Sequence, residues 1–79
     1  MHTPFEELPD TAFLRERELL RGLVPFSSAT LWRRVKTGAF PTPLKLESHI
    51  TVWRVGDIRA WMEDRYVNSP RVKYRGAKK

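Results

Sequence analysis

The sequence contains no cysteine among its 79 residues. Disulfide bonds and thiolate zinc sites are therefore excluded as sources of stability, and a reducing cytoplasm is the expected location. Long apolar runs are also absent, and residues 1–4 lack the charged start and apolar stretch of a signal peptide. We therefore expect neither a signal peptide nor a membrane span.

Groupings of residues that would support catalysis are equally scarce. The two histidines, His2 and His49, lie far apart in the sequence. No Ser/His/Asp set, paired carboxylate cleft or phosphate-binding glycine loop can be assembled from the remaining residues. The sequence therefore predicts a protein that is not an enzyme, with no metal, no other cofactor and no small-molecule substrate.

Basic charge is present in excess, with 15 Lys and Arg residues, 9 Asp and Glu residues and a net charge of +6. Residues 1–14 contain the acids Glu6, Glu7 and Asp10 and no Lys or Arg, whereas residues 66–79 contain basic residues and no acid. This balance favours a polyanionic partner. We predict an acidic flexible arm over 1–12, one folded domain over 13–66 and a basic disordered tail over 67–79.

Hydrophobic spacing within the folded part predicts three short helices and one hairpin. Helices are expected at about 16–21, 28–36 and 56–66, and strands at 44–46 and 50–54. Glycine is a common helix stop, and Gly22 and Gly38 follow the first two helices. On the third helix, Arg59 and Glu63 have the spacing of an ion pair. This order of elements predicts a small α+β fold of the winged helix-turn-helix type, with a two-stranded wing.

The helix over 28–36 has the features of a helix that lies in a DNA groove. Ser27 is the expected N-cap, and the first turn is kept small by Ser28 and Ala29. At 100° per residue, Leu31 and Val35 share an apolar face. The opposite side holds Ala29, Arg33 and Lys36. We expect Arg33 to contact guanine or phosphate in the major groove and Lys36 to contact phosphate.

Several other residues have two open interpretations. The hydroxyls of Ser28 and Thr30 either contact DNA or only cap the helix, and Arg34 either contacts phosphate or faces solvent. Arg15, Arg54 and His49 either contact the DNA backbone or a groove, or have no such role. In the tail, Lys73 and Arg75 either follow the phosphates or only keep the protein soluble. The residues expected at a DNA interface are thus Arg15, Ser28, Ala29, Thr30, Arg33, Arg34, Lys36, His49, Arg54, Lys73 and Arg75.

A resemblance to a known family extends over about residues 13–65. Its most specific parts are the helix-Gly-x-Phe-Pro-x-Pro segment that includes Gly38, Phe40, Pro41 and Pro43, and the later Trp53-Arg54 pair followed by Trp61. In these parts the chain resembles the AlpA-type prophage regulators, which are related to phage excisionases and to the MerR DNA-binding head. The resemblance implies a cytoplasmic protein of phage or integrative-element origin.

The function that the resemblance implies is sequence-specific binding of double-stranded DNA, at operator or attachment-site repeats. Such a protein acts as a transcriptional regulator, as an excisionase (a recombination directionality factor), or as both. Its partners would be DNA, an integrase, or other copies of itself on DNA. The alternative is a protein-interaction adaptor that docks an integrase, terminase or polymerase subunit. The sequence leaves the choice among these roles open.

Overall fold

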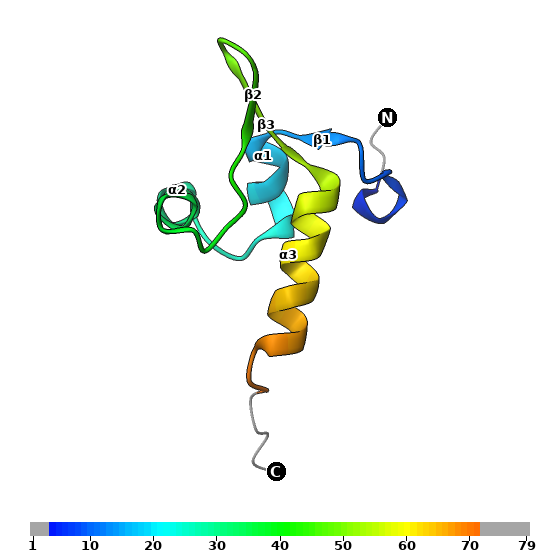
Figure 1. The fold of residues 1–79 in the computed structure, drawn as a ribbon, viewed down its shortest axis with the longest axis vertical. Coiled ribbons are helices and arrows are strands. Elements are labelled where there is room, and N and C mark those ends of the chain that lie inside the picture. The colour runs from blue at the N-terminus through cyan, green and yellow to red at the C-terminus, as the bar shows by residue number, and fades with distance from the viewer. Residues whose placement is uncertain (1–3, 72–79) are drawn as a thin grey trace.

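Helices and a three-stranded antiparallel sheet form a small α+β fold in the computed structural model, which describes residues 4–71 (Figure 1). The elements in chain order are the 3-10 turn η1 (Phe5–Glu7), β1 (Phe13–Leu14), α1 (Glu16–Glu18) with its π-helical continuation η2 (Leu19–Leu23), α2 (Ser28–Thr37), β2 (Leu44–Glu47), β3 (Ile50–Arg54) and α3 (Val55–Asn68). The order of helix, helix, hairpin and helix is compatible with a winged-helix arrangement.

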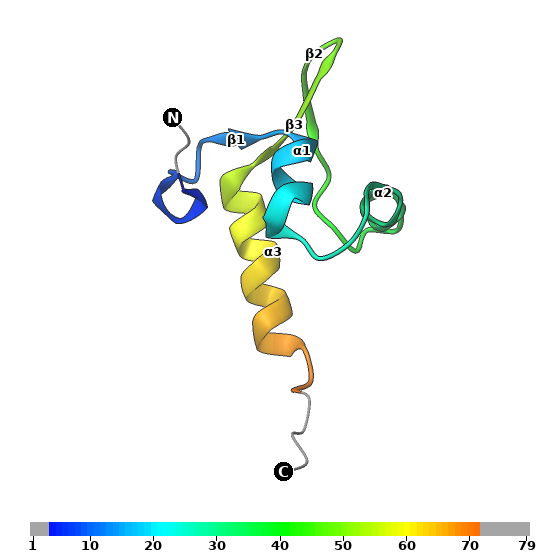
Figure 2. The ribbon, with the colours of Figure 1, turned by 180° about the vertical axis from the view of Figure 1, so that it is seen from behind.

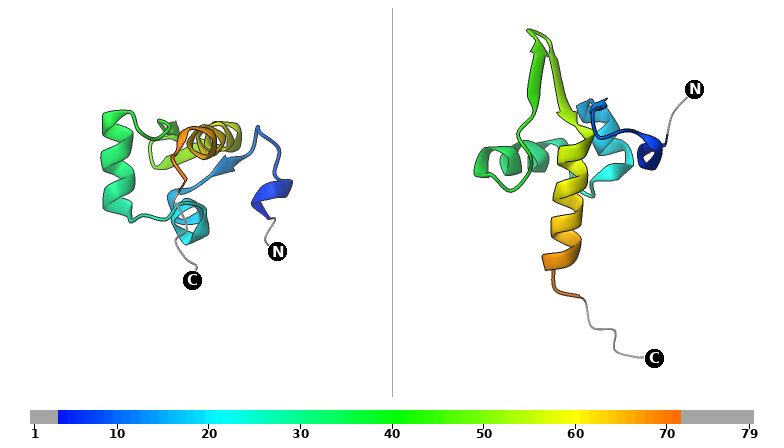
Figure 3. Two further views of the ribbon diagram at one scale, coloured as in Figure 1. Left: turned by 90° about the horizontal axis from the view of Figure 1, so that it is seen from below. Right: turned by 45° about the vertical axis from the view of Figure 1, so that its right-hand side comes forward.

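The elements are arranged around α1 and α3. Figures 1 and 2 show α2 on one side of this pair and the N-terminal segment on the other. The β2–β3 hairpin and the end of α3 project in opposite directions (Figure 1). The view from below in Figure 3 shows α2 standing apart from the other helices, so one long side of α2 lies open.

The caps of α2 are those that the sequence predicts. The Ser27 Oγ accepts a hydrogen bond from the Thr30 N–H at 3.3 Å, which satisfies one of the free donors at the helix start. At the other end Gly38 has φ 85° and ψ 7°, and its N–H donates to carbonyl oxygens of the last turn. Glycine is favoured in this left-handed conformation because it has no Cβ. The predicted helix over 28–36 is confirmed and extends to Thr37.

The sheet contains the predicted hairpin and one additional strand. In the hairpin Leu44 pairs with Val52, and in the additional strand Phe13 of β1 pairs with Arg54. β1 has only two residues and therefore shows no alternation of polar and apolar side chains that a sequence analysis could detect. Because β1 leads directly into α1, its pairing fixes the start of α1 beside the hairpin.

The core gathers side chains from every helix and from the sheet. The largest fully buried side chains are Trp53, Leu19, Leu31, Ile58 and Val55. The indole N–H groups of buried Trp53 and half-buried Trp61 find acceptors in the segment after α2. Trp53 Nε1 donates to the Pro41 carbonyl oxygen at 2.8 Å, and Trp61 Nε1 donates to the Ala39 carbonyl oxygen at 2.9 Å. These bonds join α2 to β3 and α3.

Residues 4–12, predicted to be a flexible arm, lie against α3. The Arg59 guanidinium pairs with Asp10 at 2.7 Å and donates to the Phe5 carbonyl oxygen at 2.9 Å. The predicted pairing of Arg59 with Glu63 is therefore wrong. It considered only neighbours on one helix, whereas the acceptors of Arg59 come from a segment about 50 residues earlier. Phe5 also packs against the core. The division of the chain into arm, domain and tail stays a prediction.

Several predicted boundaries shift by a few residues. The first helix continues through η2 to Leu23 rather than ending at 21, although Gly22 already has a non-helical backbone. α3 begins at Val55 and continues to Asn68, so residues 67–68, assigned to the tail, are helical. Lys73 and Arg75 lie outside the described residues. Within 4–71 no helix combines the length and the apolar character that a membrane crossing requires.

Candidate nucleic-acid interface

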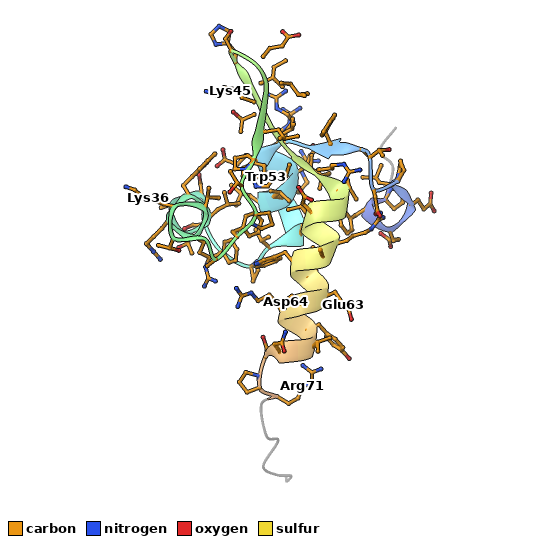
Figure 4. The ribbon with its side chains drawn as sticks, in the orientation of Figure 1. Lys36, Lys45, Trp53, Glu63, Asp64 and Arg71 are labelled. Atoms are coloured by element: carbon orange, nitrogen blue, oxygen red, sulfur yellow. The ribbon has the colours of Figure 1, made fainter. Side chains whose placement is uncertain are left out.

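One long side of α2 is formed by exposed small and basic side chains. Ala29, Arg33 and Lys36 are all exposed, and we call these three residues the α2 face. Lys36 extends away from the rest of the molecule (Figure 4). The 10 residues of α2 span about 15 Å at 1.5 Å per residue. A helix of this size fits the major groove of B-DNA, which is about 12 Å wide.

The opposite side of α2 packs against the core. Leu31 is completely buried, and the Trp32 ring centre lies 5.5 Å from that of Trp53. Trp32 remains 38% exposed, so it borders the core and also reaches the surface. The burial of Leu31 directs the α2 face away from the core.

The side chains on the two flanks of α2 have partners within the protein. The Arg34 guanidinium carbon lies 4.8 Å from the centre of the Phe26 ring, a cation–π contact that leaves Arg34 half-buried. The Thr30 Oγ1 accepts weak hydrogen bonds from Arg33 and from Ser27. On the other flank, the Ser28 hydroxyl donates a hydrogen bond to Glu16 of α1.

A second basic surface lies between α1 and the hairpin. A hollow of about 250 Å³ is lined by Arg15, Glu16, Arg17, His49 and Thr51, and we call it the α1–wing hollow. The structure thus brings two predicted residues, Arg15 and His49, to one place. The Ser28–Glu16 hydrogen bond connects this hollow with the start of α2. The α2 face and the α1–wing hollow therefore flank one shared edge of the molecule.

The hairpin adds one basic residue that the sequence analysis missed. Lys45 pairs directly with Thr51, so both side chains project from the same face of the sheet. Because Thr51 lines the α1–wing hollow, Lys45 lies on the hollow's side of the sheet. The alternation of side chains along β2 predicts that Lys45 and Leu44 project from opposite faces of the hairpin. The sequence does not say which of these faces meets α1.

Arg54, a predicted site residue at the end of β3, does not line the α1–wing hollow. It pairs with Phe13, and it is three positions from Thr51, so the two side chains project from opposite faces of the strand. Arg54 is exposed. A role for it at the DNA interface stays a prediction, and its contact would have to come from the outer face of the sheet.

Charge is distributed unevenly over the described residues. α2 carries three basic residues and no acid, whereas the start of α1 and the hairpin carry basic and acidic residues together. Glu6, Glu7 and Asp10 lie in the segment on the far side. Figure 4 shows Lys36 and Lys45 on α2 and the hairpin, and Glu63 and Asp64 on α3. A polyanion would approach the side of the molecule that carries α2 and the hairpin.

Other kinds of site find little support in the described part of the chain. Among residues 4–71, no three His, Asp or Glu side chains come together as a metal site would require. A hollow of about 280 Å³ lies between the N-terminal segment and α1–η2, and its lining includes Phe5, Leu8 and Leu23. The charged residues Glu6, Glu18 and Arg21 also line it.

Comparison with known proteins gives one match. The family model described as prophage CP4-57 regulatory protein (AlpA) matches residues 12–66, which is more than half of the chain. A search of curated proteins and a search of solved structures found no match. The matched range begins just before β1 and ends inside α3, so it contains α2, the hairpin and the α1–wing hollow.

Proposed function

The chain belongs to the AlpA family of prophage regulatory proteins, and from this premise we propose that it is a sequence-specific DNA-binding protein. It is a winged helix-turn-helix protein in which α2 enters the major groove. The hairpin lies along the neighbouring DNA backbone, with the α1–wing hollow against a phosphate. Lys73 and Arg75 add contacts to phosphates outside the recognised sequence.

This proposal rests on the contrast in burial between the two faces of α2. Leu31 is fully buried on one side, while Arg33 and Lys36 are exposed on the other with only the small Ala29 before them. A small first turn allows the helix to approach base edges closely. An Arg at the next turn then has the reach for a bidentate contact to guanine O6 and N7.

The residues around the α2 face have supporting roles. Ser28 and Thr30 lie in the first turn of α2, where a hydroxyl is within reach of a phosphate or a base edge. Arg34 remains a candidate for a phosphate at the flank of the groove, although its stacking on Phe26 limits its reach. Arg15 and His49 hold the backbone from the α1–wing hollow.

For the biological role, we propose control of transcription, of excision, or of both. An excisionase of this kind binds phased repeats in an attachment site and bends the DNA for an integrase. A regulator binds an operator that overlaps a promoter. Both roles use the same α2 contacts, and the partners are an integrase or further copies of the protein on adjacent sites.

Direct binding measurements test the proposal. Purified protein is titrated onto DNA flanking its own gene, including any integrase attachment site, at about 150 mM salt, an ionic strength at which weak phosphate contacts are screened. We expect saturable binding that excess unrelated DNA does not displace. Arg33→Ala should weaken this specific complex by about 1–3 kcal/mol. Binding that excess unrelated DNA displaces completely would contradict the proposal.

Footprinting on the same DNA distinguishes the two roles. Protection of phased direct repeats within an attachment site, accompanied by bending, indicates an excisionase. Protection of one operator that overlaps a promoter indicates a transcriptional regulator. Neither pattern is expected if the chain binds DNA only through its net charge.

A second candidate function is a protein-interaction adaptor, and the end of α3 is the feature that favours it. Tyr66 and Val67 are 66% and 62% exposed on a helix end that projects from the body. Exposed apolar side chains on a helix can anchor a partner protein. If this role dominates, Tyr66→Ala with Val67→Ser should abolish function while Arg33→Ala leaves it intact.

A further inference from the structure

A single carboxylate, that of Glu16, lies at the junction of the two surfaces assigned to DNA. It accepts the hydrogen bond from the Ser28 hydroxyl at the start of α2, and it lines the α1–wing hollow beside Arg15 and Arg17. It is half-buried rather than free in solvent. Any DNA backbone that contacts both α2 and the hairpin therefore passes close to Glu16.

Within residues 4–71, the carboxylate of Glu16 forms no ion pair, although Arg15 and Arg17 are its neighbours. The Ser28 hydroxyl, a neutral donor, is its hydrogen-bonding partner there. A carboxylate that is held in one place, with no ion pair among the described residues, repels any phosphate brought close to it.

We propose that Glu16 determines specificity, by penalising every complex in which only phosphates face it. This inference rests on the proposed function. Binding to unrelated DNA depends almost wholly on phosphate contacts. Repulsion between Glu16 and a phosphate therefore weakens this binding, and no new contact offsets the loss. At the recognised sequence, the second carboxylate oxygen accepts from an amino group at a base edge, such as cytosine N4, which offsets the repulsion. Specificity is the difference between the two affinities.

The Ser28 hydrogen bond is essential to this role. A glutamate on a free side chain could turn into solvent and avoid the phosphates. Held by the first residue of α2, the carboxylate keeps one position relative to the helix that enters the groove. Ser28 therefore acts through Glu16 as a positioning residue. With its one hydroxyl proton donated to Glu16, its oxygen can accept from a base amino group but cannot donate to a phosphate.

The test compares two substitutions that change the net charge equally. Glu16→Gln keeps an oxygen that accepts from Ser28 but removes the charge at the interface. Glu7→Gln makes the same change on an exposed residue of the N-terminal segment, on the far side from α2. For each full-length variant, the dissociation constants are measured for the footprinted DNA and for an unrelated duplex, over a series of salt concentrations.

We expect Glu16→Gln to bind the unrelated duplex about three- to tenfold more tightly than the original protein, as expected for one charge near a phosphate. Its affinity for the recognised sequence should change by less, so the specificity ratio falls. Glu7→Gln should leave both affinities within about twofold, since its charge lies on the far side of the molecule from α2 and salt screens it.

Two results would overturn this inference while leaving the proposed function standing. Equal effects of Glu16→Gln and Glu7→Gln would show that only net charge matters. Weaker binding of Glu16→Gln to both DNAs, with a lower melting temperature, would show that Glu16 only holds α2 in place. If the original protein does not discriminate between the two DNAs, the proposed function itself fails.

Discussion

The Trp53 indole N–H donates a hydrogen bond to the Pro41 carbonyl oxygen at 2.8 Å. This bond joins the middle strand of the sheet to the segment that follows α2, and it lies within the core. The orientation of α2 relative to the hairpin therefore depends on it. If α2 and the hairpin contact DNA together, this bond contributes to both stability and recognition.

Replacing Trp53 by Phe should destabilise the protein by about 1–3 kcal/mol. The substitution leaves the Pro41 carbonyl without its donor and removes part of a fully buried side chain. The measurement is urea-induced unfolding followed by circular dichroism. Trp32→Phe is the matched control, because Trp32 is 38% exposed and its replacement should lower the free energy of unfolding clearly less. Equal losses for the two variants would contradict this assignment.

Gly38→Ala should lower the free energy of unfolding by about 1 kcal/mol, because φ at this position is 85° and an added Cβ is strained there. Gly38→Asn should lose less, since asparagine tolerates the left-handed region better than alanine. Thermal melting of the three proteins checks the order glycine, asparagine, alanine. A stabilised alanine variant would show that α2 does not end in this way.

Arg33→Ala and Lys36→Ala should weaken DNA binding in different ways. Loss of the Arg33 contact to a base should cost about 1–3 kcal/mol at the recognised sequence and relax discrimination at one position. Loss of Lys36 should weaken binding to all sequences and reduce the salt slope by about one. Anisotropy titrations over several salt concentrations give both quantities. Arg21→Ala, in a hollow beside the N-terminal segment, is the charge-matched control and should change neither.

Arg59→Ala should release the N-terminal segment without affecting DNA binding. The Arg59–Asp10 pair is partly exposed, with side-chain exposures of 31% and 66%, so its loss should cost less than about 1 kcal/mol. The bond to the Phe5 carbonyl oxygen is lost as well. Amide hydrogen exchange should become faster over residues 5–12 and remain unchanged in α2. Weaker binding to DNA would show that this segment supports the interface.

The helices and the hairpin could be predicted from the sequence because their signals are local. Ser27 and Gly38 mark the ends of α2, and the spacing of Leu31 and Val35 identifies its buried side. The face formed by Ala29, Arg33 and Lys36 follows from the same periodicity. The periodicity of the sequence is therefore sufficient to identify the exposed side of α2.

The remaining features depend on contacts between distant parts of the chain. β1 exists only because Phe13 meets Arg54, and Arg59 turns to Asp10 rather than to Glu63. The meeting of Glu16 with Ser28 likewise crosses a turn between two helices. No local pattern signals such contacts, so the sequence could not show that a carboxylate lies between the basic surfaces.

The central claim is that α2 reads base edges in the major groove, and methylation interference tests it most directly. Target DNA is methylated sparsely at guanine N7, in the major groove, and adenine N3, in the minor groove, and bound DNA is separated from free DNA. We predict that methylation of particular guanines at N7 prevents binding by the original protein. Interference only at adenine N3, or none at any base, would contradict the account.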